Sequence, residues 1–287
     1  MEDFSLDHVG IVVPDLDHAF GSFQRLGFTL TSRSSHKLQS EPDGPFEQIG
    51  SGNHCVMFKQ GYLELLGITD ASKPHDSVTR RLERYTGLQL VALGCSDAYA
   101  VERVWRRVTD GCQPVVPLGR DVPLVGGGIK HGAFNNVYLS DEAVPEVELF
   151  AIEHLTPEVL WQDALLHHPN SAVGLQSVSI VSDEADVTAS RVIRLGLNRT
   201  PGPHGDRFVC RDGGWIDVMS SHAAAKAFPD ATPPTIPCAI ASSYWVEELR
   251  TARDFLAGEG VDFEASRGRL RVPPDFAEGC IIDFVER

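Results

Sequence analysis

Residues 6–13 read Leu6-Asp7-His8-Val9-Gly10-Ile11-Val12-Val13, an apolar strand pattern that carries a single histidine. Residues 61–66 read Gly61-Tyr62-Leu63-Glu64-Leu65-Leu66, a second pattern of this kind that carries a single carboxylate. An imidazole and a carboxylate on facing strands of a curved sheet are donors that a divalent metal prefers. We therefore expect His8 and Glu64 to share one site.

The pattern around these two strands recurs along the chain. Each of four segments has an apolar strand, an amphipathic helix with apolar residues at three-to-four spacing, a turn with glycine, and further strands. The expected first strands and helices are 6–13 with 16–26, 88–93 with 99–109, 175–181 with 187–195, and 236–241 with 246–257. The expected last strands each carry one acid, namely Glu64, Glu148, Asp217 and Asp283.

The residues before three of these helices favour helix initiation. Asp15, Asp97 and Asp183 stand where an N-cap carboxylate would accept hydrogen bonds from free backbone N–H groups. We expect each of them to cap the helix that follows.

Composition narrows the possible classes of function. The chain has 287 residues with 25 Lys and Arg against 40 Asp and Glu, so its net charge is −15 and nucleic acid is not an expected partner. No apolar run reaches the roughly 18 residues of a membrane span, and the acidic start of the chain is unlike a signal peptide. The six scattered cysteines favour buried free thiols over disulfides. We expect a cytoplasmic protein without a membrane partner.

The four segments resemble the βαβββ modules of the vicinal oxygen chelate superfamily, which includes glyoxalase I, bleomycin-resistance proteins and type I extradiol dioxygenases. Residues 6–13, Asp15-Leu16-Asp17, Leu26-Gly27-Phe28 and the strands 50–58 and 61–66 carry the resemblance, which favours the glyoxalase-like branch. It implies an α+β fold in which tandem modules pair into two cup-shaped mixed sheets. The N-terminal domain would span 1–154 (modules at about 5–70 and 87–154), and the C-terminal domain 173–287 (modules at about 173–222 and 235–287), with a connector at 155–172.

In that superfamily the first and last strands of the modules supply the ligands of a divalent ion. Carried over, these positions hold His8, Leu90, Ser177 and Cys238 on first strands, and the four acids on last strands. The resemblance thus implies a site in the N-terminal cup, with His8, Glu64, Glu148 and His154 as metal ligands. Asp217 and Asp283 lack a histidine partner, so we expect no chemistry from them.

The resemblance also implies the kind of reaction. A divalent ion (Fe²⁺, Mn²⁺, Zn²⁺ or Ni²⁺) would chelate adjacent oxygens of a small organic substrate and stabilise an enolate, as in a lyase or isomerase. Glu64 or Glu148 would be a ligand or the general base, and His54, His131 and Tyr62 would contact substrate. Two alternatives remain open: a ring-cleaving dioxygenase, and a metal-free binding or resistance protein. Exposed module edges also suggest a homodimer.

Overall fold

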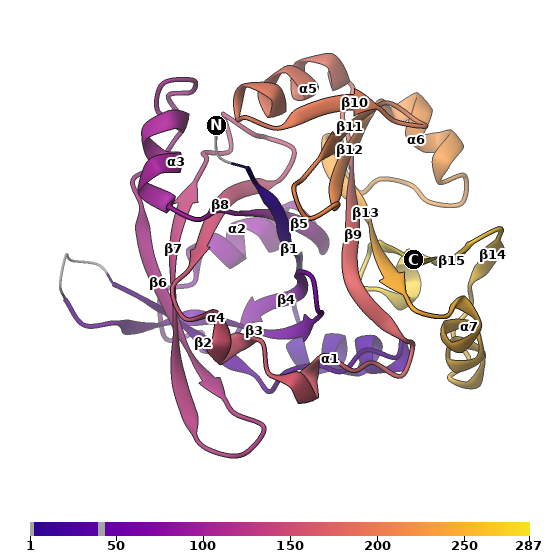
Figure 1. Ribbon diagram of the computed structural model, residues 1–287, viewed down its shortest axis with the longest axis horizontal. Coiled ribbons are helices and arrows are strands. Elements are labelled where there is room, and N and C mark those ends of the chain that lie inside the picture. The colour runs from indigo at the N-terminus through magenta and orange to yellow at the C-terminus, as the bar shows by residue number, and fades with distance from the viewer. Residues whose placement is uncertain (1–2, 40–43) are drawn as a thin grey trace.

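The computed structural model describes residues 3–39 and 44–287 (Figure 1). Its main elements follow one order four times: a strand, a helix and three strands. The first two units are β1 (Ser5–Val12), α1 (Leu16–Arg25), β2 (Ser34–Leu38), β3 (Glu47–Met57) and β4 (Tyr62–Ile68), and then β5 (Gly87–Gly94), α3 (Ala98–Trp105), β6 (Val116–Pro123), β7 (Ile129–Tyr138) and β8 (Glu148–His154).

The other two units have the same order. They are β9 (Ala172–Val181), α5 (Ala185–Arg194), β10 (Asn198–Pro201), β11 (Asp206–Val209) and β12 (Trp215–Met219), and then β13 (Cys238–Val246), α7 (Leu249–Gly258), β14 (Glu264–Ser266), β15 (Arg269–Val272) and β16 (Ile281–Glu286). Helices α2 (Asp76–Arg84), α4 (Pro157–Leu160) and α6 (Ser221–Ala227) lie between units, as does a short 3-10 turn at Asp163–Leu165. A second 3-10 turn, Pro274–Phe276, lies inside the fourth unit. The predicted α+β fold of tandem βαβββ units is confirmed.

The first two units close into one barrel with the strand order β1-β4-β3-β2-β6-β7-β8-β5. Figure 1 shows it in indigo to magenta, beside the second sheet in orange to yellow. Strands β1 and β5 join the units on one side, and β2 pairs with β6 on the other, with His36 opposite Arg120. This closure encloses the inner face of the sheet.

The last two units form a sheet with the equivalent order β10-β11-β12-β9-β13-β16-β15-β14, but this sheet stays open. Its edge strands, β10 and β14, have four and three exposed residues and do not pair with each other. The segment around α6 packs on the inner face instead, where Ala224 and Phe228 contact the cluster of Val181, Ile240 and Ile281. The chain itself therefore occupies part of the second cup.

A shared core holds the two sheets together. One cluster of buried apolar side chains draws on both, and it contains Trp105, whose indole Nε1 donates to the Leu195 carbonyl over 3.0 Å. The connector is also anchored, because Asn170 Nδ2 donates to the Leu26 carbonyl over 2.9 Å. These contacts join residues of the three predicted parts, 1–154, 155–172 and 173–287. The division into two domains and a connector stays a prediction.

Two of the three expected helix caps are confirmed. Asp15 accepts from the N–H groups of Asp17 and His18, and Asp97 accepts from that of Ala100. The expectation for Asp183 is wrong, because Glu184 is the N-cap of α5 and makes no side-chain cap bond. The Asp183 carboxylate accepts from the Ser221 hydroxyl at the start of α6 instead.

Two further sequence-based expectations have clear outcomes. None of the six cysteines, all of which lie in the described ranges, forms a disulfide, and five of them are buried, as predicted. Across the described ranges 3–39 and 44–287, no helix is long and apolar enough to span a membrane.

Candidate functional site

The barrel encloses a cavity of about 140 Å³. Its wall combines apolar side chains with an unusual number of polar ones. The polar lining residues are His8, His36, Ser51, Asn53, Tyr62, Glu64, Ser77, Arg81, Arg120, Asn136, Tyr138 and Glu148. Since burying polar groups is costly unless they are paired, this concentration marks the cavity as the candidate site.

His8 is held rigidly on β1. The pairing of β1 with β5 shifts register between Leu6 and His8, which places Asp7 at an irregularity of the strand. His8 Nδ1 donates to the Asp7 carboxylate over 2.7 Å, so Nε2 carries the free lone pair. The ring of Tyr62 stacks on the imidazole at 4.1 Å, and its hydroxyl lies 3.4 Å from His8 Nε2.

Glu64 faces His8 from the parallel strand β4. Its Oε2 lies 4.0 Å from His8 Nε2, and its Oε1 accepts from Asn53 Nδ2 and lies 3.5 Å from His36 Nε2. Burial alone would raise the pKa of Glu64, but His36, His8 and Asn53 together lower it to about 2. Glu64 is therefore an anion although it is only 7% exposed.

Glu148 lines the same cavity from β8, but it has a partner of its own. Arg81, on helix α2, forms an ion pair with it. Burial raises the pKa of Glu148, while the Arg81 charge opposes this shift. Leu90, at the first-strand position of the second unit, lines the cavity with an apolar side chain.

His154 lies behind Asp7. Its Nε2 is 3.1 Å from both Asp7 carboxylate oxygens, and its buried Nδ1 has no hydrogen-bond partner among the residues that the structure describes. Burial alone would raise the pKa of Asp7, but His154 and His8 hold it well below its usual range. The structure thus joins His154 to His8 through a shared carboxylate and does not bring it to Glu64.

The three residues predicted to contact substrate are separated by the fold. Tyr62 lines the cavity. His54 is directed away from the cavity, with Nδ1 on the Thr31 carbonyl at 2.8 Å and its ring against Phe20. His131 is exposed on β7 and packs against Phe46. Neither histidine is among the lining residues, and their contact with substrate stays a prediction.

Two of the donors present, His8 and Glu64, are placed to bind one divalent ion. Asp7 orients His8 so that Nε2 faces the Glu64 carboxylate, an arrangement in which a carboxylate fixes a ligating imidazole. Glu148 fits only if Arg81 releases it, and Nε2 of His154 is engaged with Asp7. No group of three or more His, Cys, Asp or Glu side chains within the described chain is arranged to hold a metal.

Sequence reasoning missed four residues of the site: Asp7, His36, Arg81 and Arg120. Asp7 adjoins His8, and neighbours on a regular strand point to opposite faces, so only the irregularity of β1 reveals its role. Arg81 lies on α2, a helix that was not predicted. His36 and Arg120 meet through the β2–β6 pairing. The available signal for Arg120 was an arginine in the otherwise largely apolar stretch Val116–Pro123, where Asp121 is the other charged residue.

The second sheet neutralises its acids by direct pairing. Arg207, opposite Asp217 in the β11–β12 register, binds both of its oxygens at 2.7 and 2.9 Å. Arg271, opposite Asp283, binds both of its oxygens at 2.8 Å.

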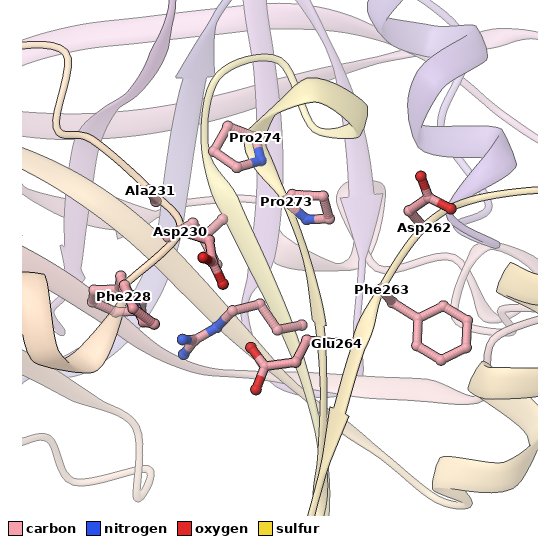
Figure 2. A pocket seen from close by; sticks show the side chains of 11 residues that line it. Phe228, Asp230, Ala231, Asp262, Phe263, Glu264, Pro273 and Pro274 are labelled. Atoms are coloured by element: carbon pink, nitrogen blue, oxygen red, sulfur yellow. The ribbon is translucent and has the colours of Figure 1, made fainter.

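A larger cavity of about 300 Å³ lies on this inner face, beside the segment that follows α6. Figure 2 shows Phe228 and Asp230 on one side of it and Asp262 and Phe263 on the other. Arg271 lines this cavity, and its guanidinium binds the Asp283 carboxylate.

The sequence profile of the glyoxalase-like domain matches residues 6–196. The chain belongs to this glyoxalase-like family. No curated protein sequence matches it. Among solved structures, a hypothetical protein from Staphylococcus aureus is similar over 100% of both chains, with a TM-score of 0.70 and 13% identity.

Two further solved structures connect the fold to enzymes. A variant of 4-hydroxymandelate synthase from Streptomyces coelicolor is similar over 100% of this chain and 93% of its own, with a TM-score of 0.58 and 11% identity. A Mn(II)-bound glyoxalase from Novosphingobium aromaticivorans is similar over 100% of this chain and 83% of its own, with a TM-score of 0.55 and 10% identity. At these identities the likeness shows the shared fold alone.

Proposed function

We propose that this member of the glyoxalase-like family is a metal-dependent lyase or isomerase that acts on a small organic substrate in the cavity of the N-terminal barrel. The observation that carries the proposal is the pairing of His8 Nε2 with the Glu64 carboxylate, 4.0 Å apart in a polar cavity. His8 and Glu64 would hold the ion, and the remaining coordination positions would be open to two adjacent substrate oxygens. When bound, the ion would act as a Lewis acid on those oxygens.

The chain's own residues prepare the site for proton transfer. Asp7 keeps the proton of His8 on Nδ1, which leaves Nε2 as a donor of electrons toward the cavity. Burial raises the pKa of Tyr62 well above its usual value, so its hydroxyl stays protonated and can donate to a substrate oxygen. Glu148 would act as the base once it leaves Arg81.

A metal-free binding protein is the second candidate, and the Arg81–Glu148 ion pair favours it. This pair neutralises one carboxylate of the cavity without any cation from solution. The dioxygenase alternative would use two imidazoles and one carboxylate on one ion. His8 Nε2 and His36 Nε2 lie 4.0 and 3.5 Å from the two Glu64 oxygens, but Asn53 Nδ2 is 2.9 Å from His36 Nε2 and would have to release it.

Metal content tests the proposal. Protein purified without chelators, and protein dialysed against Mn²⁺, Fe²⁺, Ni²⁺ or Zn²⁺, would be analysed by inductively coupled plasma mass spectrometry. We expect about one ion per chain in the native protein, and loss of that ion in His8→Ala and Glu64→Gln. His131→Ala, which changes an exposed histidine outside the cavity, is the matched control. Equal metal content in all four proteins would refute the assigned site, and no metal under any condition would favour the binding protein.

A further inference from the structure

Arg120 is the least expected residue of the cavity. It lies on β6, is only 5% exposed, and lines the space between β1, β4 and β7. The one hydrogen bond found for its guanidinium among the described residues runs from Nη1 to Cys55 Sγ, over 3.2 Å. Its buried Nε has no partner in the described part of the chain, and the guanidinium lies 5.7 Å from the centre of the Phe134 ring.

No carboxylate of the described chain approaches Arg120 within the 4.0 Å of an ion pair. The two acids of the cavity have other partners: Glu64 accepts from Asn53, and Glu148 pairs with Arg81. The Cys55 thiol does not supply a negative charge, because burial raises its pKa. The charge of Arg120 therefore has no counter-ion in contact with it.

The second sheet provides a comparison within the same molecule. Arg271 is the other described arginine that is less than a tenth exposed, and Asp283 binds it through both oxygens at 2.8 Å. A guanidinium stays charged at any ordinary pH, so burial without a counter-ion is costly. The fold provides a contacting counter-ion at Arg271, whereas the Glu64 charge acts on Arg120 only from beyond ion-pair distance and the Arg120 side chain borders the cavity.

We propose that Arg120 binds an anionic group of the substrate, a carboxylate or a phosphate, and so selects a small organic acid. A guanidinium recognises the two oxygens of either group through parallel hydrogen bonds. The cavity beside Arg120 has a volume of about 140 Å³ and adjoins a second hollow that also contacts Arg81 and Glu148, so short acids are suitable first probes. This inference rests on the proposed function, since it places the substrate beside His8 and Glu64.

The test compares ligands that differ only in charge. L-lactate and L-lactamide have nearly the same shape and the same hydroxyl group, but only lactate is an anion. Inorganic phosphate shows whether the site prefers a phosphate to a carboxylate. Each would be titrated into wild-type protein, Arg120→Met, Arg120→Lys and Arg253→Met at constant ionic strength, with calorimetry and melting temperature as readouts. Arg253→Met removes one exposed positive charge on α7, outside the residues that line the cavity, and serves as the control.

We expect lactate or phosphate, but not lactamide, to raise the melting temperature of wild-type protein and of Arg253→Met. Arg120→Met should bind the effective anion at least tenfold more weakly, and Arg120→Lys should recover part of the loss. Without ligand, Arg120→Met should melt no lower than wild-type protein, because it removes a charge that lacks a partner. A purely structural arginine would instead lower the melting temperature when replaced.

Two results would overturn the inference: no effect of either anion on wild-type protein, or an equal effect on Arg120→Met. Metal content, measured on the same samples, separates this outcome from failure of the proposed function. Arg120→Met should keep the ion of His8 and Glu64, since it removes neither donor. Either overturning result, obtained with the metal retained, would therefore count against the role of Arg120 and not against the proposed function.

Discussion

Replacing His168 with glutamine should make the stability of this protein less dependent on pH. His168 belongs to the connector before β9 and is 8% exposed. Its Nε2 donates to the Met57 carbonyl over 2.9 Å, and its Nδ1 accepts from the Thr29 N–H over 3.0 Å. A second proton on Nδ1 would face that N–H group, so the native state holds the neutral ring.

The magnitude follows from the pKa of this ring in the two states. Burial, opposed in part by the hydrogen bond to Met57, lowers the pKa of His168 to about 4 in the native protein, against about 6.5 in an unfolded chain. Well above pH 6.5 the ring is neutral in both states, so His168 contributes nothing to the pH dependence of the unfolding free energy. Between pH 6.5 and 4 only the unfolded chain binds the proton, so stability falls as the pH falls, by about 2 kcal/mol at pH 5.

Urea unfolding at pH 7.5 and pH 5.0 would measure this change. The loss of unfolding free energy between these pH values should be about 2 kcal/mol smaller in His168→Gln than in wild-type protein. His204→Gln, at an exposed turn position, should leave the loss unchanged. An identical loss in wild-type protein and His168→Gln would refute the assignment of a neutral, buried ring.

Three further substitutions test other parts of the argument. Asp7→Asn should weaken metal binding about 10- to 100-fold, because His8 loses the carboxylate that fixes its Nδ1 proton. Competition with a fluorescent chelator would measure the affinity, and an unchanged affinity would argue against the role of Asp7. Arg271→Met should cost about 3 kcal/mol in urea unfolding, because it leaves the buried Asp283 carboxylate with only Arg269, 3.8 Å away; a cost below about 1 kcal/mol would contradict the pairing. Gly27→Ala should lower the melting temperature, because φ is +83° there and a Cβ would lie 2.8 Å from Asn170 and Phe255 side-chain atoms; Gly21→Ala, where a Cβ meets nothing within 4 Å, is its control.

The fold could be predicted from the sequence because its signals are local. Apolar alternation and helical spacing indicated four strand–helix–strand units, and the structure has them. Failures arose where a longer-range contact decided the outcome. Strand β13 continues to Val246, so α7 begins at Leu249 and not at the expected residue 246. Asp183 was expected as a cap, but the Ser221 hydroxyl takes its carboxylate.

The sequence by itself determined the units of the fold and placed His8, Glu64 and Glu148 on strands, because side-chain periodicity is written into neighbouring residues. Only the tertiary structure decided which side chains share a cavity. Closure of the barrel brings Arg120 to β2, and packing of α2 brings Arg81 to Glu148. Strand pairing across a sheet joins residues far apart in the chain, and charge balance in a buried cavity depends on all of them together.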